Sequence, residues 1–165
     1  MVAQELAERW QLPRMRTRFG ALLTEGRTAP GTGPSARVAL LLPQTYMNEA
    51  GRAVGPARGS YRVPLERVLV VHDEIDLPFG ELRARLGGGL AGHNGLKSLK
   101  RELGSADFWR VRVGVGRPDA TDPEIVAAYV LGRFRQSAAE VSALVGRACA
   151  EVERVMLEQA DGDDQ

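Results

Sequence analysis

The chain has 165 residues, 44% of them hydrophobic, and a formal net charge of +1. These values predict one globular domain with a substantial core, and they exclude a protein that is basic throughout. No apolar run is long enough to cross a membrane and no signal-peptide pattern opens the chain, so we expect a cytoplasmic protein. We expect the domain to occupy residues 1–158 and an acidic tail to occupy residues 159–165.

The first half of the chain predicts two helices and two strands. Apolar residues at helical spacing indicate a helix over 2–10, and a run rich in Gly, Pro, Ser and Thr indicates a surface turn over 28–35. The short apolar runs 38–42 and 67–71 are typical of strands buried on both faces. Between them, residues 49–58 have the pattern of a helix.

The second half continues the alternation. Residues 81–85 predict a short edge strand, and residues 110–115 alternate strictly between apolar and other side chains, as a strand does. Residues 123–129 predict a short helix, and a continuous apolar stripe predicts a long helix over 137–158. We therefore expect an α/β fold, a single-domain three-layer sandwich with a mixed, largely parallel central sheet flanked by helices.

Polar residues follow two of the predicted strands, where ligands bind in parallel sheets. One group spans residues 44–48 and the other runs from His72 to Asp76. Asp73 is placed to orient a histidine that acts as general base. A metal site is the weaker interpretation, because no second cluster has metal-ligand spacing. Asn48 can hold a peptide backbone or a water, although an isolated Asn more often forms a turn.

A glycine-rich segment over residues 87–95 is the most informative feature of the chain, with five glycines in nine residues. It leads into His93, Asn94 and Lys97 and then into leucines at helical spacing. Such a segment at a helix N-terminus can bind a phosphate or a carbonyl, and a plain flexible connection is the alternative. The segment lacks both the P-loop ending and the usual dinucleotide pattern, so a nucleotide-dependent small-molecule enzyme is a remote alternative.

Basic side chains crowd the same region of the chain. They are Arg83, Arg85, Lys97, Lys100, Arg101, Arg110 and Arg112. If Arg83, Arg85 and Arg112 share one face near the glycine-rich segment, they form a surface for phosphates. Ordinary solvated charge is an equally good interpretation of the sequence.

Taken together, five segments resemble the bacterial-type peptidyl-tRNA hydrolase family, in family order and with family-like spacing. They are residues 42–51 (LPQTYMNEAG), 71–78 (VHDEIDLP), 87–98 (GGGLAGHNGLKS), 110–118 (RVRVGVGRP) and 129–134 (YVLGRF). The resemblance covers essentially the whole chain. It implies hydrolysis of the ester between a peptidyl group and tRNA, with no metal or organic cofactor. It further implies a monomer that acts on peptidyl-tRNA and needs no obligate protein partner.

The resemblance also implies roles for particular residues. An aspartate matching Asp73 orients a catalytic histidine and supports its charge, and Asn94 and His93 lie in the same catalytic group. The substrate-binding side chains are expected to be Tyr46, Met47, Asn48 and Asn94. The side chains expected to meet tRNA phosphates are Arg83, Arg85, Lys97 and Arg112.

One departure from the family pattern concerns the catalytic histidine itself. Family members open with a buried strand and a segment that carries this histidine, and neither has a match here. His72 and His93 are the only histidines of the chain, and both match other family positions. We expect a chain incomplete at its amino end, with a sheet that lacks an inner strand and with poor hydrolysis. The alternatives are a short relative that binds tRNA or another RNA without hydrolysis, and a chain in which His93 takes over as base.

Overall fold

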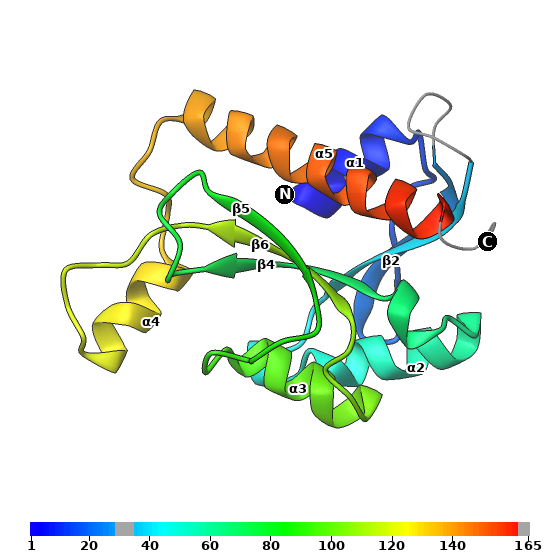
Figure 1. Cartoon of the computed structure of the whole chain (residues 1–165), viewed down its shortest axis with the longest axis horizontal. Coiled ribbons are helices and arrows are strands. Elements are labelled where there is room, and N and C mark those ends of the chain that lie inside the picture. The colour runs from blue at the N-terminus through cyan, green and yellow to red at the C-terminus, as the bar shows by residue number, and fades with distance from the viewer. Residues whose placement is uncertain (29–34, 162–165) are drawn as a thin grey trace.

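The computed structural model describes residues 1–28 and 35–161 (Figure 1). The α-helices in these residues are Val2–Arg9 (α1), Gly51–Tyr61 (α2), Asn94–Leu103 (α3), Pro123–Leu131 (α4) and Ala138–Asp161 (α5). The strands are Arg16–Arg18 (β1), Ala21–Arg27 (β2), Arg37–Pro43 (β3), Leu69–Glu74 (β4), Leu82–Leu86 (β5) and Trp109–Gly114 (β6). Met47–Glu49 (η1) and Leu65–Arg67 (η2) are short 3₁₀ helices. The turn predicted over 28–35 lies mostly at residues 29–34, outside the described part.

The helices predicted from apolar spacing are confirmed, with small shifts at their ends. Asp122 caps α4, because its side chain accepts a hydrogen bond from the Glu124 N–H at 2.8 Å, and Pro123 occupies the first helical position. The long helix α5 runs on to Asp161 and so takes in the first residues of the predicted acidic tail. None of the helices in the described residues is long and apolar enough to span a membrane.

The sheet differs from the prediction. The strands form two separate three-stranded sheets, ordered β1-β2-β3 and β4-β6-β5. In the first sheet both pairings are antiparallel. In the second, β4 pairs with β6 in parallel and β5 pairs with β6 antiparallel. The expectation of one largely parallel sheet is therefore wrong for the described residues, because most of their pairings are between antiparallel neighbours.

An antiparallel hairpin near the amino end accounts for part of this difference. Strands β1 and β2 pair from Arg18 to Ala21, with only Phe19 and Gly20 between them. Both turn residues have positive φ, 55° and 69°, which is the backbone of the tight turn that suits the twist of a hairpin. The hairpin was not predicted, because Phe19 is not a residue that sequence rules associate with such a turn.

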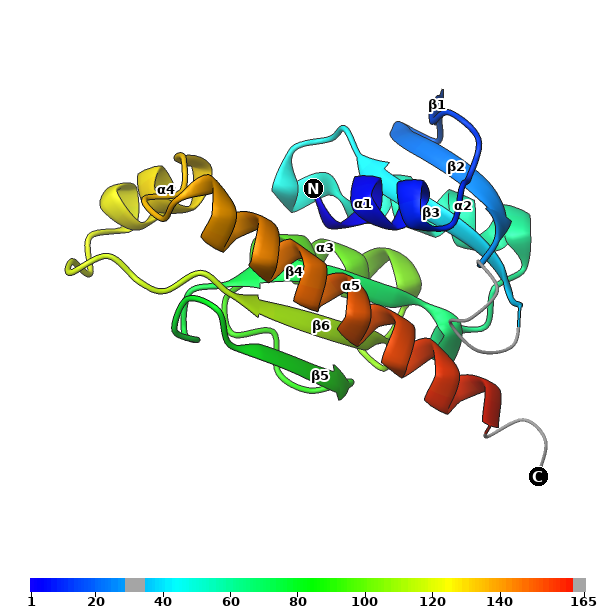
Figure 2. The ribbon, with the colours of Figure 1, turned by 90° about the horizontal axis from the view of Figure 1, so that it is seen from above.

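Helices cover the sheets on two sides (Figures 1 and 2). Helices α1 and α5 lie on one side, where Leu6, Val152 and Trp10, which directly follows α1, pack with Val111 of β6. Helices α2 and α3 lie on the other side, where Leu96, Leu99, Leu103 and Phe108 form a second core. Neighbouring residues of β4 serve the two cores in turn, as the alternation of a strand requires. The three-layer arrangement is thus observed, although its middle layer is divided.

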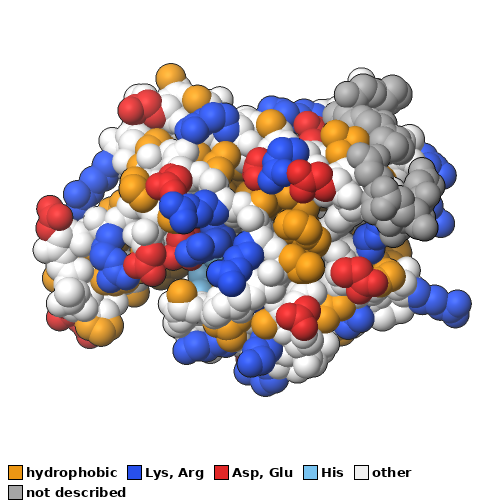
Figure 3. All heavy atoms as spheres, in the orientation of Figure 1, with side chains coloured by type: hydrophobic (Ala, Val, Ile, Leu, Met, Phe, Trp, Pro, Cys, Tyr) orange, Lys and Arg blue, Asp and Glu red, His pale blue; other side chains and the backbone are white. Residues whose placement is uncertain are grey.

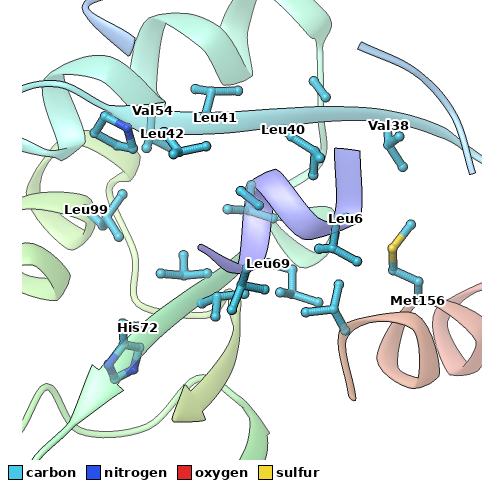
Figure 4. A pocket seen from close by; sticks show the side chains of 18 of the residues that line it. Leu6, Val38, Leu40, Leu41, Leu42, Val54, Leu69, His72, Leu99 and Met156 are labelled. Carbon is cyan, nitrogen blue, oxygen red and sulfur yellow. The ribbon is translucent and has the colours of Figure 1, made fainter. Parts of the chain in front are cut away.

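An apolar cavity of about 1050 Å³ lies where the two sheets face each other. Figure 4 shows side chains of β3, such as Leu40 and Leu42, on one side and Leu69 and His72 of β4 on the other. Strands β3 and β4 are each the last strand of their sheet, so neither pairs with a neighbour on this side. Their apolar residues are consequently half-buried, and the prediction that both strands are buried on both faces is wrong.

We expect the native chain to bind the dye 8-anilinonaphthalene-1-sulfonate in this cavity, because dry apolar cavities far smaller than this one take up aromatic ligands. Fluorescence titration of the folded protein measures the binding. Leu69→Trp adds volume at the cavity wall and should lower dye binding, whereas Leu131→Trp, at a residue that is 84% exposed on α4, should not. A folded protein that causes no increase in the fluorescence of the dye would contradict the prediction.

Candidate active site

The candidate site forms where η1 meets the start of α3. The Gly51 N–H donates a hydrogen bond of 2.9 Å to Ser98 Oγ, which fixes the start of α2 against α3. A Cβ on Gly51 would lie only 2.3 Å from the Ser98 carbonyl oxygen, so the approach requires glycine. This docking brings Met47 to Gly95 and His93, and all three line the cavity together with Asp73 at the end of β4.

His93 is the residue that caps α3. Its Nδ1 accepts a hydrogen bond from the Leu96 N–H at 3.2 Å, so in the neutral ring the proton is carried by Nε2. Nε2 lies 3.6 Å from Asp73 Oδ1. Both ring nitrogens are thereby engaged, one as an acceptor for the helix and one as an N–H directed at a carboxylate. In this arrangement His93 has no free lone pair with which to take a proton from water.

Asp73 is the carboxylate of the site. The neighbouring His93 N–H holds the pKa of this carboxyl below its usual value, against the opposing effect of burial. Asp73 is therefore negatively charged at neutral pH. The sequence predicted that Asp73 faces a histidine, and the histidine that the structure brings to it is His93.

His72 is buried beside this pair, with 9% of the residue exposed. Its Nδ1 lies 2.8 Å from the Asp73 carbonyl oxygen and donates to it, and its ring meets the His93 ring edge-on at 4.8 Å. Burial lowers the pKa of His72, so the ring is neutral. Its Nε2 is buried without a hydrogen-bond partner in the described residues.

The four predicted substrate-binding residues lie on the two elements that meet at the site. Met47 and Asn48 belong to η1, Tyr46 directly precedes it, and Asn94 is the first residue of α3. All four are exposed, and Tyr46 is 82% exposed. Of these residues, Met47 lines the cavity together with Asp73 and His93, and Asn94 directly follows His93 in the chain.

The predicted basic residues of the sheet share one face. Arg83 is paired in register with Arg112 and Arg85 with Arg110, and directly opposed residues of antiparallel strands point the same way. Figure 3 shows Lys and Arg side chains gathered over this part of the surface, beside a histidine. Lys97 is exposed on the nearby helix α3.

The basic residues differ in how free their charges are. Glu81 lies 2.5 Å from Arg83, and the buried Glu74 lies 3.5 Å from Arg112. Arg85 and Lys97 are exposed and form no ion pair within the described residues, so their charges are the most available to a phosphate.

Arg110 was predicted only as one charge among several, and it proves to be buried, with 3% of the residue exposed. Burial and the neighbouring Arg85 and Arg112 lower its pKa. Its guanidinium donates to the carbonyl oxygens of Gly88 and Gly89 in the glycine-rich segment. The alternating pattern of the strand predicts that Arg110 lies on the face of the sheet away from the valines. It does not reveal that a loop covers this face at Arg110, so the sequence pattern could not identify the contact.

These features define an α/β protein with a histidine–carboxylate pair at a strand end, beside an arginine face suited to a polyanion. The sequence model of the family described as Peptidyl-tRNA hydrolase matches residues 1–164, so the chain belongs to this family.

Individual relatives agree. The chain is 42% identical over 151 residues to a peptidyl-tRNA hydrolase of Azorhizobium caulinodans, a match that covers 92% of this chain and 70% of the relative. It is 43% identical to one of Xanthobacter autotrophicus, with 92% and 71% covered. Among solved structures, peptidyl-tRNA hydrolase from Acinetobacter baumannii superposes with a TM-score of 0.79 at 29% identity and covers 98% of this chain and 79% of that one. A complex of peptidyl-tRNA hydrolase with N-propanol gives 0.77 at 30% identity, with 96% and 80% covered.

Proposed function

We propose that the site around Asp73 and His93 carries out the hydrolysis for which the family is named, at the ester that joins a peptidyl group to tRNA. The observation that carries this proposal is the pair of Asp73 Oδ1 and His93 Nε2, 3.6 Å apart, next to an arginine face on the same sheet. The carboxylate–histidine pair suits a reaction in which protons are transferred, and the arginine face suits the phosphates of the tRNA backbone. The experiment that tests it is a comparison of hydrolysis and tRNA binding in the same Asp73 variant, given in the Discussion.

The chemistry requires a proton acceptor. Water adds to the ester carbonyl, the bond to the ribose oxygen breaks, and the proton lost by water ends on that oxygen. His93 is proposed as a positioning residue in this reaction, because its Nδ1 is engaged by the Leu96 N–H and its Nε2–H is directed at Asp73. The proton acceptor is therefore an imidazole other than that of His93. Asp73 is proposed to stabilise the positive charge that forms on this imidazole when it accepts a proton at the site.

The peptidyl group is proposed to lie along η1 and the start of α3. The amides of Asn48 and Asn94 can each donate and accept a hydrogen bond, as a peptide backbone or an attacking water requires. The exposed side chains of Tyr46 and Met47 supply apolar contacts for peptide side chains.

The tRNA is proposed to lie along Arg83, Arg85, Lys97 and Arg112. We infer a monomer in the cytoplasm, with no obligate protein partner and no cofactor. The support for this inference is that one chain supplies the carboxylate, the amides and the arginine face of the proposed site, and that peptidyl-tRNA is made in the cytoplasm.

Binding of tRNA or another RNA without efficient hydrolysis is the second candidate function. The state of the two histidines favours it: His93 has no free lone pair, and the Nε2 of His72 is buried. Under this alternative the arginine face retains its role, and only the rate of ester cleavage distinguishes the two functions.

Replacing Arg85 with Met is expected to weaken tRNA binding and to reduce the slope of log K against log salt by about 0.9, the value for one lost phosphate contact. Arg83→Met should have a smaller effect, because Glu81 already neutralises Arg83. Arg154→Met, on α5 and paired with Glu151, is the control. Equilibrium titrations at several salt concentrations provide the slopes. An unchanged slope for Arg85→Met would show that this face is merely solvated charge.

A further inference from the structure

Arg110 is a buried cation without a carboxylate partner in the described residues. Instead, its guanidinium is bound to backbone oxygens: Nη1 donates to Gly89 at 2.6 Å, and Nη2 donates to Gly88 and Ala106, both at 3.1 Å. Burying a charge without an opposite charge is costly. The Arg110 side chain fixes three carbonyl groups, and contacts of this kind determine the conformation of a loop.

The carbonyl groups that Arg110 binds determine where the next amides point. In a trans peptide the C=O of one residue and the N–H of the next are directed oppositely, and none of the peptide bonds here is cis. The carbonyls of Gly88 and Gly89 are directed at Arg110, so the N–H groups of Gly89 and Leu90 are directed away from it. Neither N–H donates a hydrogen bond within the part of the chain that the structure describes.

Arg85 lies next to Gly88, the residue that precedes these two amides. Its Cζ and Nε lie 2.8 Å from the position that a Cβ on Gly88 would occupy. Gly88 also has a φ of +102°, a backbone conformation that side chains disfavour. Two N–H groups without a partner in the described residues, together with the unpaired guanidinium close to the preceding glycine, can supply a set of donors to an anion.

We propose that Arg110 is a positioning residue that turns the Gly89 and Leu90 amides outward, and that these amides and Arg85 together bind one phosphate of the tRNA. The inference rests on the proposed function, because the phosphate belongs to the tRNA. It assigns Arg110 no direct contact with the substrate. The charge contacts of this phosphate come from Arg85, and the neutral hydrogen bonds come from the backbone.

The test is the salt dependence of binding to deacylated tRNA. Arg110→Lys keeps the charge but loses the planar fork that holds two carbonyls. Replacing the Leu90 amide with an ester, through incorporation of the hydroxy acid, deletes one N–H and leaves every side chain in place. Each change is expected to weaken binding by about tenfold without changing the salt slope, since neutral amides release no counterions. Gly59→Ala on α2 is the control, because a Cβ there meets open space and Gly59 has no part in the proposed site.

Three results would overturn the proposal while leaving the proposed function intact. They are wild-type affinity in both variants, a smaller salt slope in Arg110→Lys, and a loss in Gly59→Ala as large as that in the ester variant. If Arg110→Lys does not fold, the ester variant alone decides. A wild-type chain that does not bind tRNA would overturn the inference and the proposed function together.

Discussion

Added imidazole is expected to accelerate hydrolysis of peptidyl-tRNA by the 165-residue chain by about 10²-fold or more, the scale on which a positioned base acts. Without it we expect slow turnover, because the Nδ1 of His93 is engaged by the Leu96 N–H and the Nε2 of His72 is buried. The cavity reaches Asp73, His93 and Met47, so a small heterocycle has room beside them. Single-turnover kinetics with excess protein measure both rates.

Pyrazole is the control for this experiment, since it has the size of imidazole without its basicity. His93→Ala should retain the fold-acceleration by imidazole at a lower absolute rate, because His93 is a positioning residue and not the base. Rapid turnover without imidazole that His93→Ala abolishes would contradict this account and would make His93 the general base.

Replacing Asp73 with Asn is expected to have the second large effect on the rate of hydrolysis. We expect it to lower the imidazole-supported rate by about 10²- to 10⁴-fold, because a neutral amide cannot support the charge of a protonated imidazole. Affinity for deacylated tRNA should stay unchanged, since within the described residues Asp73 forms an ion pair with His93 and with none of the arginines of that face. The measurements are single-turnover rates and a binding titration on the same protein sample.

Asp76→Asn is the matched control for Asp73→Asn, because Asp76 is an exposed carboxylate that pairs with Arg117. It should leave the rate close to that of the wild type. A large loss of tRNA binding in Asp73→Asn, with hydrolysis intact, would rule out the orienting role.

The helices were the predictable part of the fold. Leu6 and Trp10 at the start, and Val152 and Val155 near the end, recur at helical spacing, and all four are buried where that spacing requires. The hairpin at Phe19 was missed because its turn depends on a positive φ at a bulky residue, which composition does not signal. The division of the sheet could not be predicted from the apolar runs either, because they indicate which residues are buried but not which strands are neighbours.

The site was predictable in its members more than in its contacts. Asp73 stood out because it follows an apolar run, and His93 because it ends a glycine-rich segment. Their approach to 3.6 Å depends on the start of α3 lying against the end of β4, a tertiary contact that the pattern of the sequence does not specify. The capping of α3 by His93, which commits its Nδ1, depends on one backbone N–H and could be recognised only in three dimensions.

The proposed cleavage of the peptidyl-tRNA ester at Asp73 is tested most directly by the release of N-acetyl-phenylalanine from N-acetyl-phenylalanyl-tRNA. The release is measured with excess wild-type protein and with Asp73→Asn, each with and without imidazole. We predict release above the spontaneous rate by the wild type, a further rise with imidazole, and loss of both in Asp73→Asn at unchanged tRNA affinity. Wild-type protein that binds tRNA yet releases no N-acetyl-phenylalanine under either condition would contradict the claim and would favour an RNA-binding relative without hydrolysis.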